Sequence, residues 1–206
     1  MAHDPIPGQL TAAAEAIAGG GVVAYPTETF YALGADPNQS EALDHLLRLK
    51  GRAAANKPLL LLIASLDDLG DWVHEFPPAF DRLVAHFWPG ALTMVLPARA
   101  GLPSALTGAS GGVAVRLTSH PVALGLLRAC GTVLPGTSAN RTGAPPCADA
   151  DAVRTAFGDQ LTVVVDGGPT AAVQPSTVLD LTGEKPRILR PGAIDAAAIA
   201  RVVGLV

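Results

Sequence analysis

The chain has 206 residues, of which 49% are apolar, 16% charged and 4% aromatic, and its formal net charge is −4. This length fits one large domain or two small ones, and the apolar fraction is sufficient for a sizeable buried core. The acidic balance argues against a broad nucleic-acid-binding surface, which requires a basic excess, but it leaves room for a local basic pocket.

Apolar periodicity and capping residues predict helices that alternate with strands. We expect helices over residues 9–18, 40–49 (capped by Ser40), 78–87, 121–129, 149–157 and 196–203, with a capping box at residues 65–68 that starts a further short helix. We expect strands over residues 22–25, 59–64, 92–96, 113–117, 133–134, 161–165, 177–181 and 187–189. This order predicts one α/β domain over residues 1–206 with a mixed sheet. Residues 98–112, rich in Gly, Ser and Ala, form either a mobile lid or a solvated loop.

No segment predicts export or membrane insertion. The N-terminus has no basic patch followed by an apolar core, and the longest apolar run, Leu59 to Ala64, is far shorter than the roughly 20 residues of a spanning helix. Cys130 and Cys147 form neither a CxxC pair nor a zinc spacing, which favours reduced thiols. We therefore expect a cytoplasmic protein that does not cross a membrane.

Two hydroxyls and a carboxylate follow the first predicted strand. Thr27, Glu28 and Thr29 come directly after Tyr25-Pro26, and ligands of α/β proteins bind where strands end. Glu28 is placed like a general base or a magnesium ligand, or it orients the two threonines. The segment is therefore a candidate ligand site.

Three cations lie within eight residues, at Lys50, Arg52 and Lys57. An arginine fork and a lysine ammonium suit phosphate oxygens. Basic residues are also common near helix C-termini, where they complement the dipole. The added charge of Lys57 beside a predicted buried strand favours anion binding.

Further polar residues lie at the ends of later predicted strands or next to them. Ser138 and Asn140 can bind phosphate or ribose, or they can form a local turn. Arg116 and Arg190 each follow apolar strand residues and can hold a substrate carboxylate or phosphate, or lie on the surface. Ser176 comes just before a predicted strand, and its hydroxyl can bind a ligand or cap the start of that strand.

Several common catalytic patterns do not occur. The sequence has no GxxxxGK[ST] and no GxGxxG after a strand, and the segment around Ser138 lacks the closing glycine of a nucleophile elbow. Its five histidines are scattered without an HExxH, so no protein metal site is predicted.

Eight segments, in order from about residue 9 to 195, resemble the YrdC-domain family, the threonylcarbamoyl-adenylate synthases of tRNA modification. They are 26–34 (PTETFYALG), 50–52 (KGR), 57–59 (KPL), 88–93 (WPGALT), 113–116 (VAVR), 138–143 (SANRTG), 176–180 (STVLD) and 188–192 (ILRPG). The resemblance implies a twisted open α/β sheet with flanking helices and a concave basic cavity, in the short single-domain form.

The family reaction joins L-threonine, bicarbonate and ATP into threonylcarbamoyl-AMP and pyrophosphate. The resemblance assigns Thr29, Arg116 and Ser176 to threonine binding. It assigns the binding of ATP to five residues: Arg52, Lys57, Ser138, Asn140 and Arg190. Lys50 and Arg52 are the expected catalytic pair. Mg²⁺ is expected with ATP, and the expected partners are tRNA and the proteins of the threonylcarbamoyl-transfer complex.

The sequence departs from the family pattern at several positions. Leu62 stands where many members have a histidine near threonine, Gly112 and Pro146 replace hydroxyl residues near the nucleotide, and Pro175 replaces a frequent glutamate. Two other functions therefore stay open: a paralogous enzyme with a changed substrate, and a non-catalytic RNA-binding module.

Overall fold

A computed structural model describes residues 7–51, 58–107 and 111–205 and contains one mixed sheet. The helices are α1 (Pro7–Ala18), α2 (Ser40–Lys50), α3 (Phe80–Phe87), α4 (Pro121–Cys130), α5 (Ala150–Phe157) and α6 (Ala196–Val202), with 3-10 helices η2 (Leu66–Asp71) and η3 (Gly158–Gln160). The strands are β1 (Val23–Pro26), β2 (Tyr31–Gly34), β3 (Leu60–Ile63), β4 (Leu92–Pro97), β5 (Gly112–Leu117), β6 (Leu134–Ser138), β7 (Val163–Val164), β8 (Thr177–Asp180) and β9 (Arg187–Arg190).

The nine strands lie in the order β7-β1-β2-β6-β3-β5-β4-β8-β9. Three neighbouring pairs are parallel (β1 with β7, β3 with β5 and β4 with β8), and the others are antiparallel. This arrangement confirms the predicted α/β class with a mixed, open sheet.

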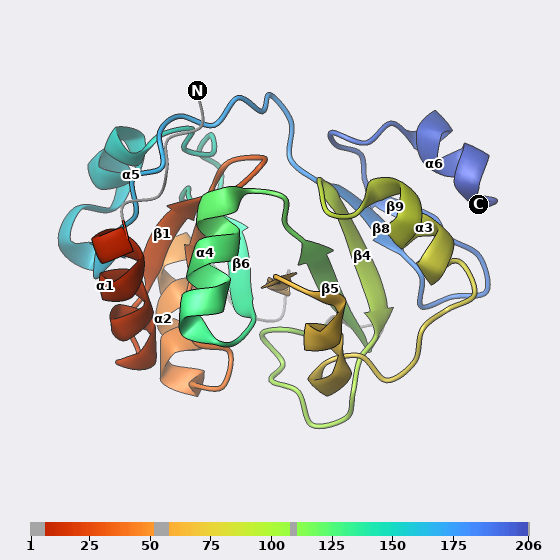
Figure 1. Cartoon of the computed structure of the whole chain (residues 1–206), viewed down its shortest axis with the longest axis horizontal. Helices are drawn as coiled ribbons and strands as arrows, with labels where there is room; N and C mark the ends of the chain where they lie inside the picture. Colours follow the sequence, from red (N-terminus) through yellow and green to blue (C-terminus); the bar gives the residue numbers. More distant parts are fainter. Residues whose placement is uncertain (1–6, 52–57, 108–110, 206) are drawn as a thin grey trace.

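Two apolar clusters lie on opposite faces of the sheet. The larger contains Leu61, Met94 and Val115 and packs against residues of α2, α3, α5 and α6. The smaller contains Tyr25 and Leu62 and packs against α1 and α4, which lie side by side in Figure 1. We call the face under the smaller cluster the α4 face. That cluster contains no residue of β4, β5, β8 or β9, so among the described residues its apolar cover ends near the middle of the sheet.

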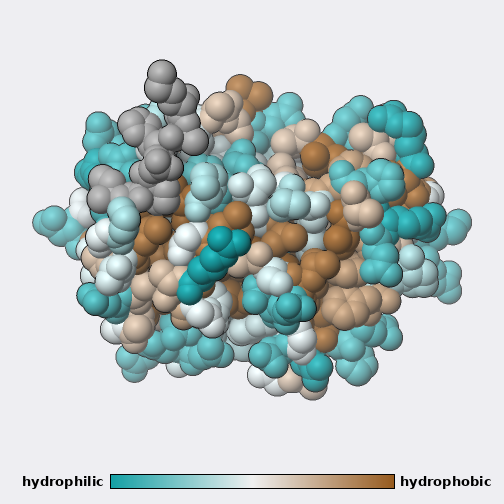
Figure 2. Space-filling model, in the orientation of Figure 1, coloured by the Kyte–Doolittle hydropathy of each residue, from teal (hydrophilic) through white to brown (hydrophobic). Residues whose placement is uncertain are grey.

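The surface view mixes polar and apolar side chains. In Figure 2 hydrophilic residues form much of the outline, and brown, apolar surface gathers nearer the middle. Within the described residues, no helix combines the length and the apolar character that crossing a bilayer requires.

All six predicted helices and the 3-10 helix after the Ser65 capping box are confirmed, with small shifts of their ends. One strand, β2, was not predicted, and β6 continues to Ser138, where a loop was expected. Ser40 is wrong as a cap, because Gln39 occupies the N-cap position without a side-chain bond. Free cysteines at 130 and 147 agree with the expected thiols.

The structure explains why position 112 is glycine. A Cβ there would lie 2.5 Å from Cγ1 of Val95 and 2.9 Å from Cγ2 of Thr182. Gly112→Ser, which introduces a hydroxyl residue at this position, should therefore lower the free energy of unfolding by about 2 kcal/mol through overpacking. Urea denaturation measures the loss. Gly183→Ser is the matched control, because a Cβ at Gly183 meets nothing within 4 Å; equal stability of both variants would contradict the steric explanation.

Candidate functional site

Strand register brings the candidate side chains to one face of the sheet. Ser138 lies opposite Ala32, and Arg116 lies opposite Leu62; both of these partners belong to the smaller cluster on the α4 face. Residues directly opposite one another share a face, and side chains alternate along a strand. Segments 22 or more residues apart therefore project polar groups from the same surface.

The same reasoning extends to the far edge of the sheet. Met94 lies opposite Val115 on the other face, so Thr93 and Arg116 project from the α4 face. Val178 lies opposite both Thr93 and Arg190, which places Arg190 on this face as well. The half of the α4 face that the smaller cluster leaves uncovered is thus lined with hydroxyls and guanidinium groups.

Arg116 is buried, with 4% of its surface exposed, and Glu28 compensates its charge. Its Nε lies 3.3 Å from Oε1 of Glu28, and its Nη1 donates to Oγ1 of Thr29 at 3.3 Å. The other oxygen of Glu28 accepts the hydroxyl of Thr118 at 2.5 Å. The prediction left Arg116 open between a binding role and the surface; the structure shows that it is buried and paired.

The turn between β1 and β2 arranges the two threonine hydroxyls. Oγ1 of Thr27 lies 3.0 Å from Oγ1 of Thr29 and donates to the carbonyl of Phe30 at 2.7 Å. Thr27 and Thr29 are both buried. Glu28 points instead to Arg116 and Thr118, so of the roles considered from the sequence, orienting the threonines is not the one its contacts favour.

Arg190 is held by Ser176. Its Nε and Nη2 donate to the Ser176 carbonyl at 3.2 and 2.7 Å, and Nη2 reaches the Ser176 hydroxyl at 3.1 Å. That hydroxyl also lies 2.9 Å from Oγ1 of Thr93. Gly192 permits this approach, since a Cβ there would collide with the backbone of residues 175 and 176.

The charge of Arg190 has no acidic partner among the described residues. Burial lowers the pKa of Arg190, and the nearby charge of Arg116 lowers it further. An arginine nevertheless stays protonated at neutral pH. A buried cation, Arg116, and a more exposed one, Arg190, repel one another, and the single carboxylate of the site is paired with Arg116. The excess of positive charge favours an anionic ligand.

Lys50 joins Ser138 and Asn140 into a second polar group. Its Nζ donates to the Ser138 carbonyl and to Oδ1 of Asn140, both at 2.6 Å, and the Ser138 hydroxyl donates to the same Oδ1. Asn140 also donates to the carbonyl of Ala144 at 2.6 Å. Asn140 therefore makes the local turn that was one of its two predicted roles, and Lys50 supports that turn from α2.

The Arg116 group (with Glu28 and Thr29) and the Lys50 group (with Ser138 and Asn140) both lie near the start of β2. The carbonyl of Tyr31 accepts from the backbone N–H of Ala139 at 2.7 Å, and Thr29 lies two residues before Tyr31. The Arg116 group and the Lys50 group therefore border the same turn. Arg52 and Lys57, which the resemblance assigns to ATP, lie outside the described residues.

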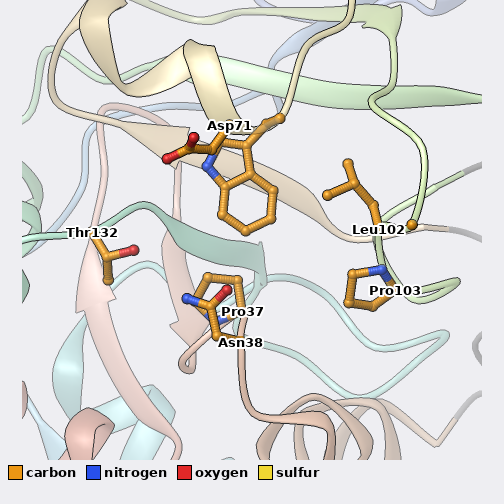
Figure 3. Close-up of a pocket in the computed structure, with 8 residues that line it drawn as sticks. Pro37, Asn38, Asp71, Leu102, Pro103 and Thr132 are labelled. Carbon is orange, nitrogen blue, oxygen red and sulfur yellow. The ribbon is translucent and has the colours of Figure 1, made fainter.

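A separate cleft of about 400 Å³ lies elsewhere and contains none of the candidate residues (Figure 3). Its lining is Pro37, Asn38, Asp71, Trp72, Gly101, Leu102, Pro103 and Thr132. A cleft with one carboxylate and no cation does not suit a phosphate, so the charged groups of the α4 face define the candidate site better than cavity size does.

The residues present give Mg²⁺ no ready protein site. Within residues 7–51, 58–107 and 111–205, no three His, Cys, Asp or Glu side chains gather as potential ligands. Glu28, considered as a ligand from the sequence, is engaged by Arg116 and Thr118.

Two residues of the site received no role from the sequence. Thr93 and Thr118 are almost fully buried, at 1% and 0% exposure, and both bond to other site residues. The sequence carries a weak signal for both: each hydroxyl stands beside apolar strand residues, Thr93 falls on the same face of the sheet as Arg116, and Thr118 follows Arg116 by two residues. Leu62, which stands where many family members have a histidine, is buried in the smaller cluster.

Fold and site together define an α/β domain with a partly buried, cationic and hydroxyl-rich surface suited to an anionic ligand. Residues 15–192 match the model of the Sua5/YciO/YrdC family, described as "Telomere recombination". The chain belongs to this family, which confirms the resemblance drawn from the eight segments.

Relatives and solved structures agree with this membership. A putative threonylcarbamoyl-AMP synthase of Mycobacterium tuberculosis H37Rv is 39% identical over 95% of this chain and 89% of its own length. The crystal structure of Pyrococcus abyssi Sua5 complexed with L-threonine is 38% identical, with a TM-score of 0.91 over 96% of this chain. This chain spans 58% of that structure's length. Escherichia coli YciO is 26% identical, with a TM-score of 0.86 over 96% of both chains.

Lys50 can be tested as a support for the Ser138 turn. Lys50→Met keeps the aliphatic stem but removes the donor to two oxygens, so the free energy of unfolding should fall by about 2 kcal/mol. Urea denaturation measures this, with Lys185→Met, at an exposed lysine, as the control. If Lys50→Met were as stable as the control while turnover disappeared, Lys50 would act on the substrate rather than on the turn.

Proposed function

We propose that this protein is a threonylcarbamoyl-AMP synthase, a nucleotidyltransferase that forms threonylcarbamoyl-AMP and pyrophosphate from L-threonine, bicarbonate and ATP. The observation that carries the proposal is the pair of guanidinium groups on the α4 face: Arg116, partly compensated by Glu28, and Arg190, without an acidic partner among the described residues. The names of the Mycobacterium and Pyrococcus relatives support the same reaction.

The chemistry requires two negatively charged reactants to meet. In the first step the amine of threonine attacks CO₂ derived from bicarbonate, which gives a carbamate with release of a proton. In the second step a carbamate oxygen attacks the α-phosphorus of ATP, and pyrophosphate leaves. Cations offset the repulsion between the carbamate and the phosphates, and fixed geometry keeps the attack in line.

Arg116 and Thr29 are the proposed contacts of threonine, with Arg116 on its carboxylate. Ser176, whose hydroxyl contacts Arg190 and Thr93, is the third proposed contact of threonine. Arg190 and the Ser138–Asn140 turn are the proposed contacts of ATP, together with Arg52 and Lys57. A guanidinium fits carboxylate and phosphate oxygens equally well, so one surface can hold both reactants.

Mg²⁺ is proposed to enter with ATP, whose phosphates bind it. The metal would neutralise phosphate charge, while the arginines hold the reactants. The product would pass to a threonylcarbamoyl-transfer complex that modifies adenosine 37 of tRNA. A cytoplasmic location is proposed on the same ground.

Pyrophosphate release tests the proposal directly. We expect release from ATP and Mg²⁺ only when L-threonine and bicarbonate are both present, and not with serine, alanine or valine in place of threonine. Release with another amino acid would favour a paralogous enzyme. No release, together with salt-sensitive RNA binding, would favour an RNA-binding module.

Thr29 should affect threonine more than ATP. Its hydroxyl lies next to Arg116, so Thr29→Ala should raise the KM for threonine about tenfold, the effect of losing roughly 1.4 kcal/mol, and change the KM for ATP little. Steady-state kinetics with each substrate varied in turn measures the difference. An equal rise in both constants would mean that Thr29 maintains the turn rather than the threonine site.

A further inference from the structure

We propose that Glu28 is a positioning residue, which fixes the guanidinium of Arg116 so that its free edge faces the carboxylate of threonine, and that the Thr118 hydroxyl holds Glu28 in place. This inference rests on the proposed function. It concerns a carboxylate that touches neither reactant in the assignments above.

The first support is the burial of Arg116. A guanidinium with 4% exposure requires a partner, because an isolated buried charge is strongly unfavourable. Glu28 is the one carboxylate paired with Arg116 among the described residues. Removal of its charge would leave Arg116 beside the second cation, Arg190, with which it already interacts unfavourably.

The second support is the part of Arg116 that Glu28 faces. The contact is to Nε, at 3.3 Å, and neither this Nε nor Oε1 of Glu28 makes a well-aligned hydrogen bond. The described residues supply no acceptor for Nη2, and Nη1 makes one bond, to Thr29. Glu28 therefore attracts the side chain from one edge and leaves the paired Nη groups available to a second carboxylate. A bidentate lock between Glu28 and Arg116 would instead have occupied them.

The third support is that Glu28 is itself held. Thr118 is fully buried, donates to Oε2 of Glu28 at 2.5 Å and accepts from the backbone N–H of His120 at 3.2 Å. Because Thr118 follows Arg116 by two residues, the same stretch of chain fixes both members of the ion pair. Glu28 therefore contacts both Arg116 and Thr118, and the three side chains come from two segments of the chain.

His120 does not compete for Glu28 at neutral pH. Burial lowers the pKa of His120, and the charge of Glu28 opposes that effect only in part, so the imidazole is neutral. Of Arg116 and His120, only Arg116 is charged and in ion-pair contact with Glu28. The orientation of Glu28 is therefore set by Arg116 and Thr118.

The test separates orientation from chemistry. Glu28→Gln keeps the shape and removes the charge, and we expect its KM for threonine to rise about tenfold or more, with the KM for ATP unchanged. Titration calorimetry with threonine should show the same loss of affinity. Glu184→Gln, at an exposed glutamate, is the matched control and should behave like the wild type.

Two variants of Thr118 complete the design. Thr118→Val removes the hydroxyl and should raise the KM for threonine in the same direction as Glu28→Gln but less. Thr118→Ser keeps the hydroxyl, loses a methyl group, and should retain the wild-type KM even if it is less stable. If the KM for threonine rose with the loss of stability in both Thr118→Val and Thr118→Ser, whether or not the hydroxyl was kept, the proposal would be overturned.

The remaining outcomes are distinguishable. If Glu28→Gln bound threonine as tightly as the wild type but lost kcat, Glu28 would be a base rather than a positioning residue. If the wild type bound threonine and Glu28→Gln matched it in every constant, the inference alone would fail. If the wild type neither bound threonine nor released pyrophosphate with it, the proposed function would fail and the inference with it.

Discussion

The compensation of the buried Arg116 charge is the constraint on which the site depends. A buried guanidinium requires a carboxylate, and here the carboxylate comes from the distant turn between β1 and β2. That ion pair ties the β1–β2 turn to the end of β5. It thereby places the Thr27 and Thr29 hydroxyls beside the guanidinium and gives the site its geometry.

Strand alternation gathers the rest. Thr93, Arg116, Ser138 and Arg190 lie on strands that are far apart in sequence, yet each falls on the α4 face by register. The helices α1 and α4 cover this face over one half of the sheet only. Where the apolar cover ends, the same alternation that buries Leu62 presents polar side chains instead.

Much of this was predictable from the sequence, and the failures have physical causes. Helices with apolar stripes and glycine ends, such as α4, were found because their signals are local. β2 was missed because its four residues follow a polar turn and carry no alternation, so its pairing with β6 decides its state. The residues of the site were found individually, but the partner of Glu28 and the roles of Thr93 and Thr118 depend on register, which sequence patterns do not define.

An acidic protein with a site for polyanions is consistent once the charges are considered locally. The net charge is −4, but surface carboxylates such as Asp151, which is exposed and paired with Arg154, are screened by solvent and salt. Arg116 is buried, where screening is weak, whereas Arg190 keeps an exposed surface while it bonds to Ser176; partial burial and, after it, the charge of Arg116 lower the pKa of Arg190. One carboxylate, paired with Arg116, against two cations leaves the site positive, and a ligand that carries its own negative charges restores the balance. Binding of the anionic reactants should thus relieve a repulsion that the fold maintains, which is why the carboxylate at position 28 must orient Arg116 without neutralising the whole site.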